Sequence, residues 1–499
     1  MTVWVLGDQL TDRAGPVAER DNAVLVIEST AFGGRLPYHP HKLQLVVAAM
    51  RAFRDRLRAD GRTVHYYQVE RFADGLAAHA TEHPGDHLRA ITPPTHGARD
   101  RMATLAAEVG LSIAFEPDPR FLCDPAAFDE WAGDRKTYRH EAFYRWMRDR
   151  TGILMDEGEP LGGAYNYDDQ NRETPPADWS PPPIPAVRAD GHADHTDAAA
   201  EWAAAVTSDD WGAPAAFQWP TTRDGALDVL DAFVADRLGE FGPYQDAMRS
   251  DSWAMAHSLL SPALNLGLLG PREVIDRVVD GRDDAPLVSV EGFVRQVLGW
   301  REFLRHVYRR EMPALAAANQ LDATLDLPPA YWTGETDMAC LADVVEGVRR
   351  RGYAHHIERL MVLSNVATLL GVRPQALNRW FHAAFVDAFH WVTTPNVIGM
   401  GTFGTDQLST KPYVTSANYV DRMSDYCAGC AYDRSATLGA DACPLNTLYW
   451  DFLDRHEDRL RSNHRMGLVY SHLDDRRDEL SDIRDRADRL QGAALDGSL

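Results

Sequence analysis

The sequence has little cysteine and lysine, and it has no long apolar run. Only five cysteines and three lysines, Lys42, Lys136 and Lys411, occur in 499 residues. No apolar stretch approaches the roughly 18 residues that a membrane-spanning helix needs, and no targeting segment precedes the strand expected at residues 2–8. Without a secretion signal, the cysteines are not expected to form disulfides. We therefore expect a monomeric cytoplasmic protein that has no membrane partner.

The scarcity of lysine accompanies a large excess of negative charge. The formal net charge is −23, and all basic residues other than the three lysines are arginine. This composition is typical of a salt-loving or high-GC host, and we expect a halophilic prokaryote. The acidity argues against nucleic-acid binding, which basic patches usually drive. At molar salt, however, the Debye length shrinks to ~3 Å, so a local arginine-lined groove could still receive DNA.

Three of the five cysteines fall within seventeen residues. Cys427 and Cys430 form a CxxC pair, and Cys443 follows with a proline directly behind it. A tetrahedral metal or a cluster needs a fourth ligand, for which we choose Cys340 over Cys123. Thiolates suit both Zn²⁺ and iron–sulfur clusters, and the spacing alone does not separate them. Two close pairs are usual for zinc, so the remote Cys340 favours a cluster. Four unrelated buried thiols are the competing interpretation.

The first 118 residues alternate between strand and helix patterns. Strands are expected at 2–8, 23–28, 63–68, 88–92 and 111–115, with helices at 43–57 and 99–109. This alternation predicts an α/β domain with a doubly wound parallel sheet. The sequence lacks the GxGxxG fingerprint of dinucleotide binding. Ligands of such sheets sit at the carboxyl ends of the strands, where we expect Gly7, Asp8, Gln9 and Glu28.

The rest of the chain divides into a connector and an all-α domain. We predict an α/β domain at residues 1–130, a connector at 131–220 and a helical domain at 221–499. The connector should hold a helix at 138–150 and a surface linker at 174–200. Helices of the last domain are expected at 226–238, 288–310, 340–370, 374–389 and 449–461, with a solvated helix or tail in the last thirty residues.

Three stretches of the helical domain carry motifs. They are Phe241–Tyr244 followed by His257–Pro262, then Glu291–Phe303, then Tyr353–Met361. Together they resemble the flavin-binding domain of the photolyase and cryptochrome family. With the four cysteines, the resemblance narrows to the iron–sulfur bacterial cryptochromes and (6-4) photolyases. It covers essentially the whole chain, and it implies a 4Fe–4S cluster at the cysteines.

The resemblance also implies FAD in the helical domain. The hydroxyls of Ser258 and Ser261 can donate to a pyrophosphate, although an ordinary helix cap is the alternative. Arg301 can neutralise a phosphate or bond the flavin edge, with a surface ion pair as its alternative. Arg359 and Asp387 fall on consecutive expected helices, and relatives pair them beside the isoalloxazine. The residues expected around FAD are Tyr244, His257, Ser258, Leu259, Leu260, Ser261, Arg301, Arg359 and Asp387.

Two histidines are expected at the DNA lesion. In (6-4) photolyases, a histidine beside the lesion assists proton transfer, which suits a side chain that titrates near neutral pH. His356 matches it by motif, with His355 as its neighbour. His356 lies three residues before Arg359, which puts both on one face of the expected helix. One core and one surface histidine is the plain alternative. Tyr413 matches an active-site tyrosine, and Lys411 is expected to contact DNA.

Tryptophans are expected to carry electrons to the flavin, because family members use a chain of aromatic residues for this purpose. Trp380 and Trp332 match the inner links by position, although most tryptophans in such a domain only fill its core. Relatives place tyrosines where this chain has Phe381 and Phe389. Phenylalanine cannot deprotonate as tyrosine does, so a branch through tyrosine is not expected.

An antenna is expected in the α/β domain. Relatives hold 6,7-dimethyl-8-ribityllumazine there, and Gly7, Asp8, Gln9 and Glu28 match their strand ends. Residues 38–42 resemble their aromatic-histidine-lysine stretch, with prolines at 37 and 40 altering its spacing.

We therefore expect a light-driven photolyase that acts on (6-4) photoproducts in UV-damaged DNA. The alternatives are a blue-light signalling cryptochrome without repair and, in another class, a zinc-stabilised DNA-binding protein without catalysis.

Overall fold

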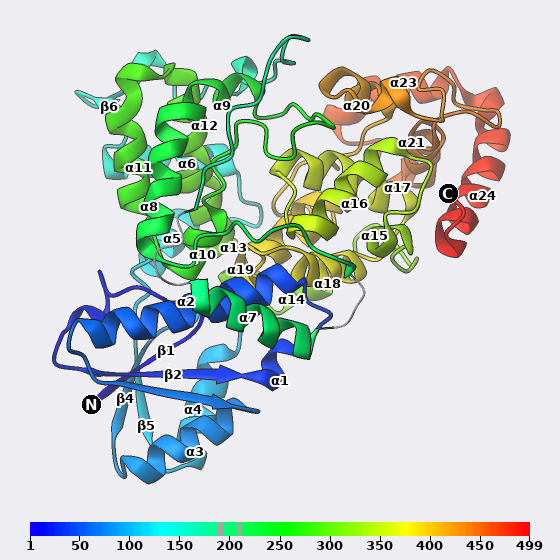
Figure 1. Cartoon of the computed structure of the whole chain (residues 1–499). Coiled ribbons are helices and arrows are strands. Elements are labelled where there is room, and N and C mark those ends of the chain that lie inside the picture. Colours follow the sequence, from blue (N-terminus) through cyan, green and yellow to red (C-terminus); the bar gives the residue numbers. More distant parts are fainter. Residues whose placement is uncertain (188–192, 208–210) are drawn as a thin grey trace.

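The computed structural model describes residues 1–187, 193–207 and 211–499. An α/β unit at the N-terminus lies at the lower left of Figure 1, and the helices of the second half lie above it and to its right. The expected connector 131–220 includes residues 188–192 and 208–210, which lie outside the described residues. Within the described ranges, no helix is at once long and apolar enough to cross a bilayer.

The N-terminal unit is built on one five-stranded sheet. Its strands are β1 (Thr2–Val5), β2 (Ala23–Ser29), β3 (Val64–Val69), β4 (His87–Ile91) and β5 (Ser112–Glu116). All neighbours are parallel, in the order β3-β2-β1-β4-β5. The chain therefore winds out to one side of β1 and then to the other. This confirms the predicted doubly wound sheet and puts its topological switch between β1 and β4.

Helices cover both faces of this sheet. Side chains alternate along β1, so that Val3 and Val5 join the core under α2 (Pro40–Ala59) and Trp4 joins the core under α3 (Phe72–Glu82) and α4 (Ala98–Glu108). Burial on both faces explains the continuous apolar runs of these strands. The core under α2 continues into the helical half, so the two parts share one apolar interior.

The connector contains more helix than the sequence indicated. Beyond α5 (Pro125–Ala132), α6 (His140–Thr151) confirms the expected helix, and the short strands β6 (Met155–Asp156) and β7 (Glu159–Pro160) follow. α7 (Ala193–Val206) packs along α2, which Figure 1 shows between the two parts of the molecule. The prediction of a surface linker was therefore wrong for residues 193–200. Ala199 and the α2 residues Val47 and Ala48 form a small buried cluster that holds α7 in place.

The second half is helical, as predicted. A continuous helical run comprises α12 (Leu287–Val294), the π-helical turns Arg295–Arg301 and α13 (Glu302–Glu311), which confirms the helix expected at 288–310. Its other main helices are α8 (Arg223–Ala232), α9 (Leu238–Tyr244), α10 (Ser261–Leu266), α11 (Pro271–Asp280), α16 (Ala339–Arg351), α17 (Asn365–Leu370), α18 (Pro374–Ala384), α19 (His390–Thr394), α20 (Ala417–Met423), α21 (Pro444–Arg455) and α24 (Leu480–Asp496).

Two expected helices are interrupted, and the site depends on both interruptions. The helix expected at 340–370 stops at Gly352, whose φ of 65° lies in the left-handed region, and resumes at His356. The helix expected at 374–389 ends at Ala384, because Phe385 adopts an extended backbone. The last thirty residues were expected to be a solvated helix or tail. Most of them are exposed and include the helix α24, but α24 also buries Ile483 and Ala487 in the core that it shares with α21.

Candidate active site and metal centre

A buried ion pair lies where the two interruptions meet. Arg359 donates from its two terminal nitrogens to the two oxygens of Asp387, each at 3.0 Å. Ser261, at the start of α10, donates to the same carboxylate at 2.7 Å, and the side chain of Asn265 donates to the Asp387 carbonyl at 2.9 Å. The Arg359 side chain is 22% exposed and that of Asp387 is 8% exposed. The structure thus brings together three of the residues predicted to line a flavin: Ser261, Arg359 and Asp387.

The segment before α10 has a strained backbone. Met255 and Leu259 both have positive φ, at 44° and 59°, which is unusual for residues other than glycine. The fully buried Arg237 holds this segment by donating to the carbonyls of Met255 and His257 at 2.8 and 2.9 Å. Burial lowers the pKa of Arg237 to about 10. Such strain persists only where surrounding contacts enforce it, and it is common at ligand-binding segments.

Three histidines pack together next to this segment. The rings of His257 and His355 are stacked with centroids 4.5 Å apart, and the His356 ring meets His257 edge-on at 5.3 Å. His257 contacts the carbonyls of Ala254 and Gln245 through its two nitrogens, each at 3.1 Å. Both His257 and His355 are buried, and desolvation holds the pKa of each ring well below its usual range. Both rings are therefore neutral at pH 7.

His356 differs from the other two histidines because it reaches the surface. Its side chain is 48% exposed, and its Nε2 lies 3.3 Å from Asp246 Oδ1. It is the first residue of the resumed helix, whereas His355 precedes that helix. The prediction that both histidines lie on one continuous helix was therefore wrong, although His356 and Arg359 do share the helical stretch.

Several buried polar atoms near the ion pair have no hydrogen-bond partner in the described part of the chain. They are the Nδ1 of His355, the Gln245 side-chain oxygen and the Trp380 indole nitrogen. The Nε2 of His355 lies 3.3 Å from Glu358 Oε1. Buried polar groups are nearly always paired in native proteins. Together with the Arg359–Asp387 pair, these atoms fit a polar heterocyclic ligand such as a flavin.

The two predicted tryptophans are linked through a third. Trp380 is buried on α18, and its ring centroid lies 6.4 Å from that of Trp211. Trp211 in turn lies 5.2 Å from Trp332, which is partly exposed. Phe385 stands between Trp380 and Arg359, with its ring 5.7 Å from Trp380 and 4.1 Å from the guanidinium carbon. An aromatic path therefore runs from the ion pair to the surface.

Sequence reasoning missed Trp211. It lies in the connector, far from either predicted tryptophan along the chain, and its indole donates to the Pro37 carbonyl at 2.8 Å. A tryptophan beside Gly212 and Pro214 has no helical or strand period to place it. No local signal could have identified it.

Arg301 lies apart from the other predicted flavin residues. It donates to the Arg120 carbonyl at 2.9 Å, lies 3.3 Å from Glu302 and stacks 4.4 Å over Phe121. These contacts join α13 to the segment that follows the sheet. Arg120 in turn donates to the Asn265 carbonyl at 3.4 Å, and the Asn265 side chain donates to the Asp387 carbonyl, so Arg301 is connected to the Arg359–Asp387 pair through two intermediate residues.

Three more predicted site residues are Tyr244, Lys411 and Tyr413. Tyr244, at the end of α9, is partly buried and packs edge-on against Trp179 at 5.5 Å. Lys411 and Tyr413 lie in the segment before α20, and Tyr413 is 37% exposed. Among the described residues, no recorded hydrogen bond connects the Lys411 or Tyr413 side chain to the histidines.

The four chosen cysteines line one small cavity. Cys340 is the second residue of α16, Cys443 immediately precedes α21, and Cys427 and Cys430 lie in and just after a short 3₁₀ turn. A backbone hydrogen bond from Cys443 to the Asp433 carbonyl, 3.0 Å long, closes the loop between them. Burial raises the pKa of Cys427 and Cys443 to about 11 each. Thiolates at this place would therefore need a bound cation.

The spacing of these sulfurs bears on the type of centre. A tetrahedral Zn–S site has Zn–S distances near 2.3 Å, which puts its sulfurs about 3.8 Å apart. Among the described residues, the groups of three metal-type ligand atoms within 4.8 Å of one another are formed by histidines and not by these cysteines. Cys123 lies elsewhere, with its amide bonded to Glu302 at 3.0 Å, and it does not line the cavity.

The predicted antenna residues lie at the carboxyl ends of β1 and β2. Gly7, Asp8 and Gln9 follow β1 at the topological switch. The Gln9 amide donates to the Ile91 carbonyl at 3.2 Å, and its side-chain oxygen has no partner within residues 1–187, 193–207 and 211–499. Burial raises the pKa of Asp8. Glu28, however, already accepts hydrogen bonds from Arg51, Tyr66 and Gln68. Its oxygens are occupied within the fold.

Residues 38–42 face the helical half and not the ends of the strands. Lys42 is buried, and its amine donates to the carbonyls of His382 and Ala388 at 2.6 and 2.8 Å. His39 contacts the Arg349 carbonyl at 2.9 Å. Desolvation lowers the pKa of Lys42 to about 7, and the nearby Asp387 carboxylate partly opposes this shift. Residues 38–42 thus stabilise the segment between α18 and α19 that carries Asp387.

Comparisons with known proteins place this geometry in context. Residues 3–219 match the family described as deoxyribodipyrimidine photo-lyase-related protein. The (6-4) photolyase of Agrobacterium fabrum is 37% identical over 486 residues, which cover 94% of this chain and 94% of that protein.

Two solved structures share the architecture. A bacterial class III photolyase from Agrobacterium tumefaciens superposes with a TM-score of 0.55 at 17% identity, and a Synechocystis cryptochrome with a TM-score of 0.60 at 14% identity. Each match covers 85% of this chain and 86% of the other. At these identities, the likeness shows the fold alone.

Proposed function

Because the chain belongs to the photolyase and cryptochrome family, we propose that it is a light-driven DNA photolyase that repairs (6-4) pyrimidine photoproducts. The observation that carries this proposal is the position of the exposed His356, which packs against the buried His257 ring and lies in the same helical stretch as Arg359 of the Arg359–Asp387 pair. One histidine can reach DNA from outside while the groups behind it hold a cofactor.

The helical half would hold FAD, which when bound supplies a photoexcited electron donor. Arg359 and Asp387 would face its heterocycle, and His355 Nδ1, which has no hydrogen-bond partner among the described residues, would find one on it. The hydroxyls of Ser258 and Ser261 would hold its polar chain. The remaining residues of the proposed flavin site are Tyr244, His257, Leu259 and Leu260. Trp380, Trp211 and Trp332 would form the path that resupplies electrons from solvent.

His356 would act as the proton donor. Repair of a (6-4) adduct needs a proton to be moved, whereas repair of a cyclobutane dimer needs only the electron. Burial lowers the pKa of His355 and so disfavours the imidazolium form that a proton donor needs, while His356 is exposed beside the carboxylate of Asp246. The lesion would be flipped out of the duplex to reach it, which costs less for a damaged base. Tyr413 would orient the lesion, and Lys411 would contact the DNA backbone.

Two further groups complete the proposal. The four cysteines would hold a 4Fe–4S cluster, since such a cluster binds each thiolate to a different iron and so separates the sulfurs more widely than zinc does. A ribityllumazine antenna would occupy the crevice at Gly7, Asp8 and Gln9, where the unpartnered Gln9 oxygen offers an acceptor. Glu28 would support that crevice through its network with Arg51 and would not bind the antenna directly.

The repair assay tests the proposal directly. The purified protein, with its flavin reduced, would be illuminated with blue light in the presence of a duplex carrying a single (6-4) lesion. Restored bases should appear only in the light. A matched duplex carrying a cyclobutane dimer should remain unrepaired. Full flavin content without repair of either lesion would favour a signalling cryptochrome. A colourless protein that contains zinc would support the non-catalytic alternative.

A further inference from the structure

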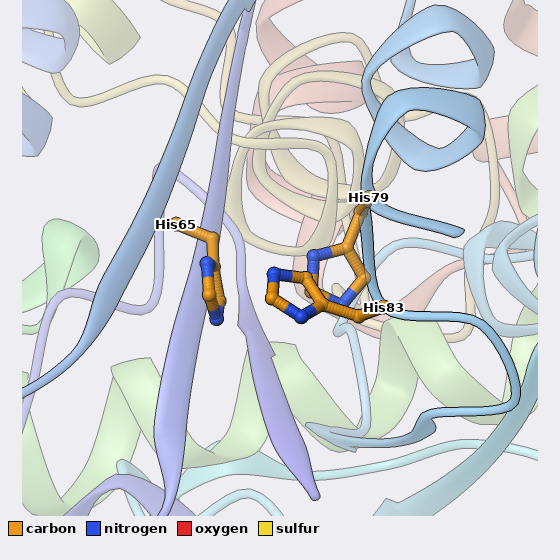
Figure 2. A group of neighbouring side chains, drawn as sticks. All are labelled: His65, His79 and His83. Carbon is orange, nitrogen blue, oxygen red and sulfur yellow. The ribbon is translucent and has the colours of Figure 1, made fainter. Parts of the chain in front are cut away.

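Three histidines lie close together within the α/β unit, far along the chain from the residues of the proposed repair site. His65 is the second residue of β3, at the edge of the sheet, and His79 and His83 lie at the end of α3 and directly after it. Their ring centroids are 4.2 to 5.1 Å apart. Each ring offers one nitrogen, and these three nitrogens lie within 4.8 Å of one another. Figure 2 shows the rings turned toward one another between strand and helix.

His79 is the fixed member of this group. It is fully buried, and its Nε2 is 3.1 Å from Asp86 Oδ2. Asp86 is held in turn by the His87 amide at 2.8 Å and by the N-terminal amine at 3.3 Å. The other nitrogen of His79, Nδ1, is buried and has no hydrogen-bond partner in the part of the chain that the structure describes. A carboxylate behind one nitrogen and a free lone pair at the other is the arrangement that orients metal-binding histidines.

We propose that His65, His79 and His83 bind a divalent transition-metal ion, with Zn²⁺ as the ion best suited to three imidazole ligands. A tetrahedral zinc with Zn–N distances near 2.0–2.1 Å needs its nitrogens about 3.3 Å apart. Small rotations of the two half-buried rings, His65 and His83, would bring the three nitrogens from their observed spacing to this distance. Glu82 and Asp86 add negative charge beside the site, which favours a cation. Three protein ligands leave a fourth position for water.

This site is separate from the others described above. His65 lies at the start of its strand, paired in register with Leu25, whereas Gly7, Asp8 and Glu28 lie at the opposite, carboxyl end of the sheet. The cysteines belong to the helical half. A metal here would join the edge strand β3 to α3 and would stabilise the α/β unit. It would take no part in repair.

Zinc binding by the full-length protein, with its cofactors in place, tests the inference. Bound zinc per chain would be measured by equilibrium dialysis and metal analysis for the wild type, His65→Ala, His83→Ala and, as a control, His472→Ala on the exposed face of α23 (Gly467–Asp474). The wild type and the control should bind one zinc ion that both site variants lose, with affinity falling at least tenfold. Asp86→Asn should weaken binding about 10–100-fold. Iron content would be measured in the same samples and should be equal in all variants. Equal iron would show that a difference in bound zinc does not come from zinc replacing iron at the four cysteines.

Two outcomes would overturn the inference. One is a wild-type protein that binds no zinc under these conditions. The other is zinc binding by His65→Ala and His83→Ala that matches the wild type. A thermal scan gives a second readout, because a ligand that binds only the folded state raises the melting temperature. Added zinc should raise it for the wild type and His472→Ala, and not for the two site variants.

Discussion

Arg359 and Asp387 are joined by two hydrogen bonds of 3.0 Å. Each residue follows a break in one of the two expected helices that the structure interrupts. Arg359 follows the break at Gly352, and Asp387 lies between α18 and α19. A buried ion pair of this kind stabilises a protein little unless other polar groups share it. Ser261 and Asn265 share this one. A bound flavin would share it further, which explains its place in the fold.

Removing one member of this pair should impair flavin binding more than folding. Asp387→Asn leaves the Arg359 charge without its carboxylate and should reduce flavin retention at least tenfold. It should also lower the free energy of unfolding by up to about 3 kcal/mol, the lower end for a broken buried pair. Flavin per chain, from the visible absorbance, measures the first effect. Asp421→Asn is the control, since the Arg434–Asp421 pair is exposed and should contribute about 0–1 kcal/mol. Full flavin in Asp387→Asn would contradict the proposed site.

The sequence was sufficient to predict this pairing but not its local structure. The doubly wound sheet followed from alternating apolar strands, and the helical half followed from its period. The motif placed Arg359 and Asp387 together through resemblance. The break at Gly352 does carry a local signal, three arginines followed by a glycine, which is typical of a helix end and was passed over. No glycine or proline marks the break at Phe385, so only tertiary packing decides where the backbone leaves the helix there.

Contacts between residues that are distant along the chain were the other feature that could not be predicted from the sequence. Lys42 was expected near the antenna, yet its amine reaches the carbonyls on either side of Asp387. Arg301 was expected at the flavin, yet it holds the Arg120 carbonyl. Both side chains are long and carry one charge, so residue type alone does not specify which of many carbonyls they meet. Trp211 was missed for a different reason, because no helical or strand period places it.

Trp211→Phe should slow light-driven flavin reduction. Among the described residues, ring contacts connect Trp380 to Trp332 through Trp211, at 6.4 and 5.2 Å, and phenylalanine is much harder to oxidise than tryptophan. The rate of flavin reduction under blue light, with an external donor, should fall, and we expect the same of Trp380→Phe. Trp391→Phe is the control, because Trp391 is equally buried but packs against Phe121. If Trp211→Phe keeps the wild-type rate while Trp332→Phe is slow, electrons pass directly between Trp332 and Trp380.

Replacing any of the four cysteines by alanine should release iron and sulfide. Cys340, Cys427 and Cys443 attach α16, the 3₁₀ turn and the start of α21 to one centre. Metal binding contributes to folding free energy, so Cys427→Ala should also lower the melting temperature. Cys123→Ala is the matched control and should keep its iron, because Cys123 lies outside the cavity. Iron and sulfide analysis decides between the outcomes. Zinc in place of iron in the wild type, or full iron in Cys427→Ala, would refute the cluster.

Lys42 should make stability depend on pH in the alkaline range. Its pKa is about 7 in the folded protein and near 10.5 when exposed. Between these values the unfolded chain binds one more proton than the folded chain. The free energy of unfolding should therefore rise with pH, by up to about 1.4 kcal/mol per pH unit. The cost of burying the charge is fully present below pH 7 and is removed as the pH approaches 10.5.

Lys42→Met removes this contribution. Urea unfolding of the wild type and the variant at pH 7, 8 and 9 gives the difference in unfolding free energy, which should shift in favour of the wild type as pH rises. Lys136→Met, at an exposed site, should show a difference that does not change with pH. A constant difference for Lys42→Met would mean that the Lys42 amine keeps its proton in the folded state.

His356→Ala should abolish (6-4) repair while sparing the cofactors. The side chain is half exposed and contacts Asp246, so its removal should leave the flavin content and the rate of flavin photoreduction unchanged. The loss in repair rate should reach about 10²–10⁴-fold, the usual contribution of general acid catalysis. His355→Ala is the comparison variant. Its ring is buried and stacked on His257, so its removal should reduce flavin retention and stability together with repair. Normal repair by His356→Ala would refute the role of His356. Loss of repair in His355→Ala with full flavin content would transfer that role to His355.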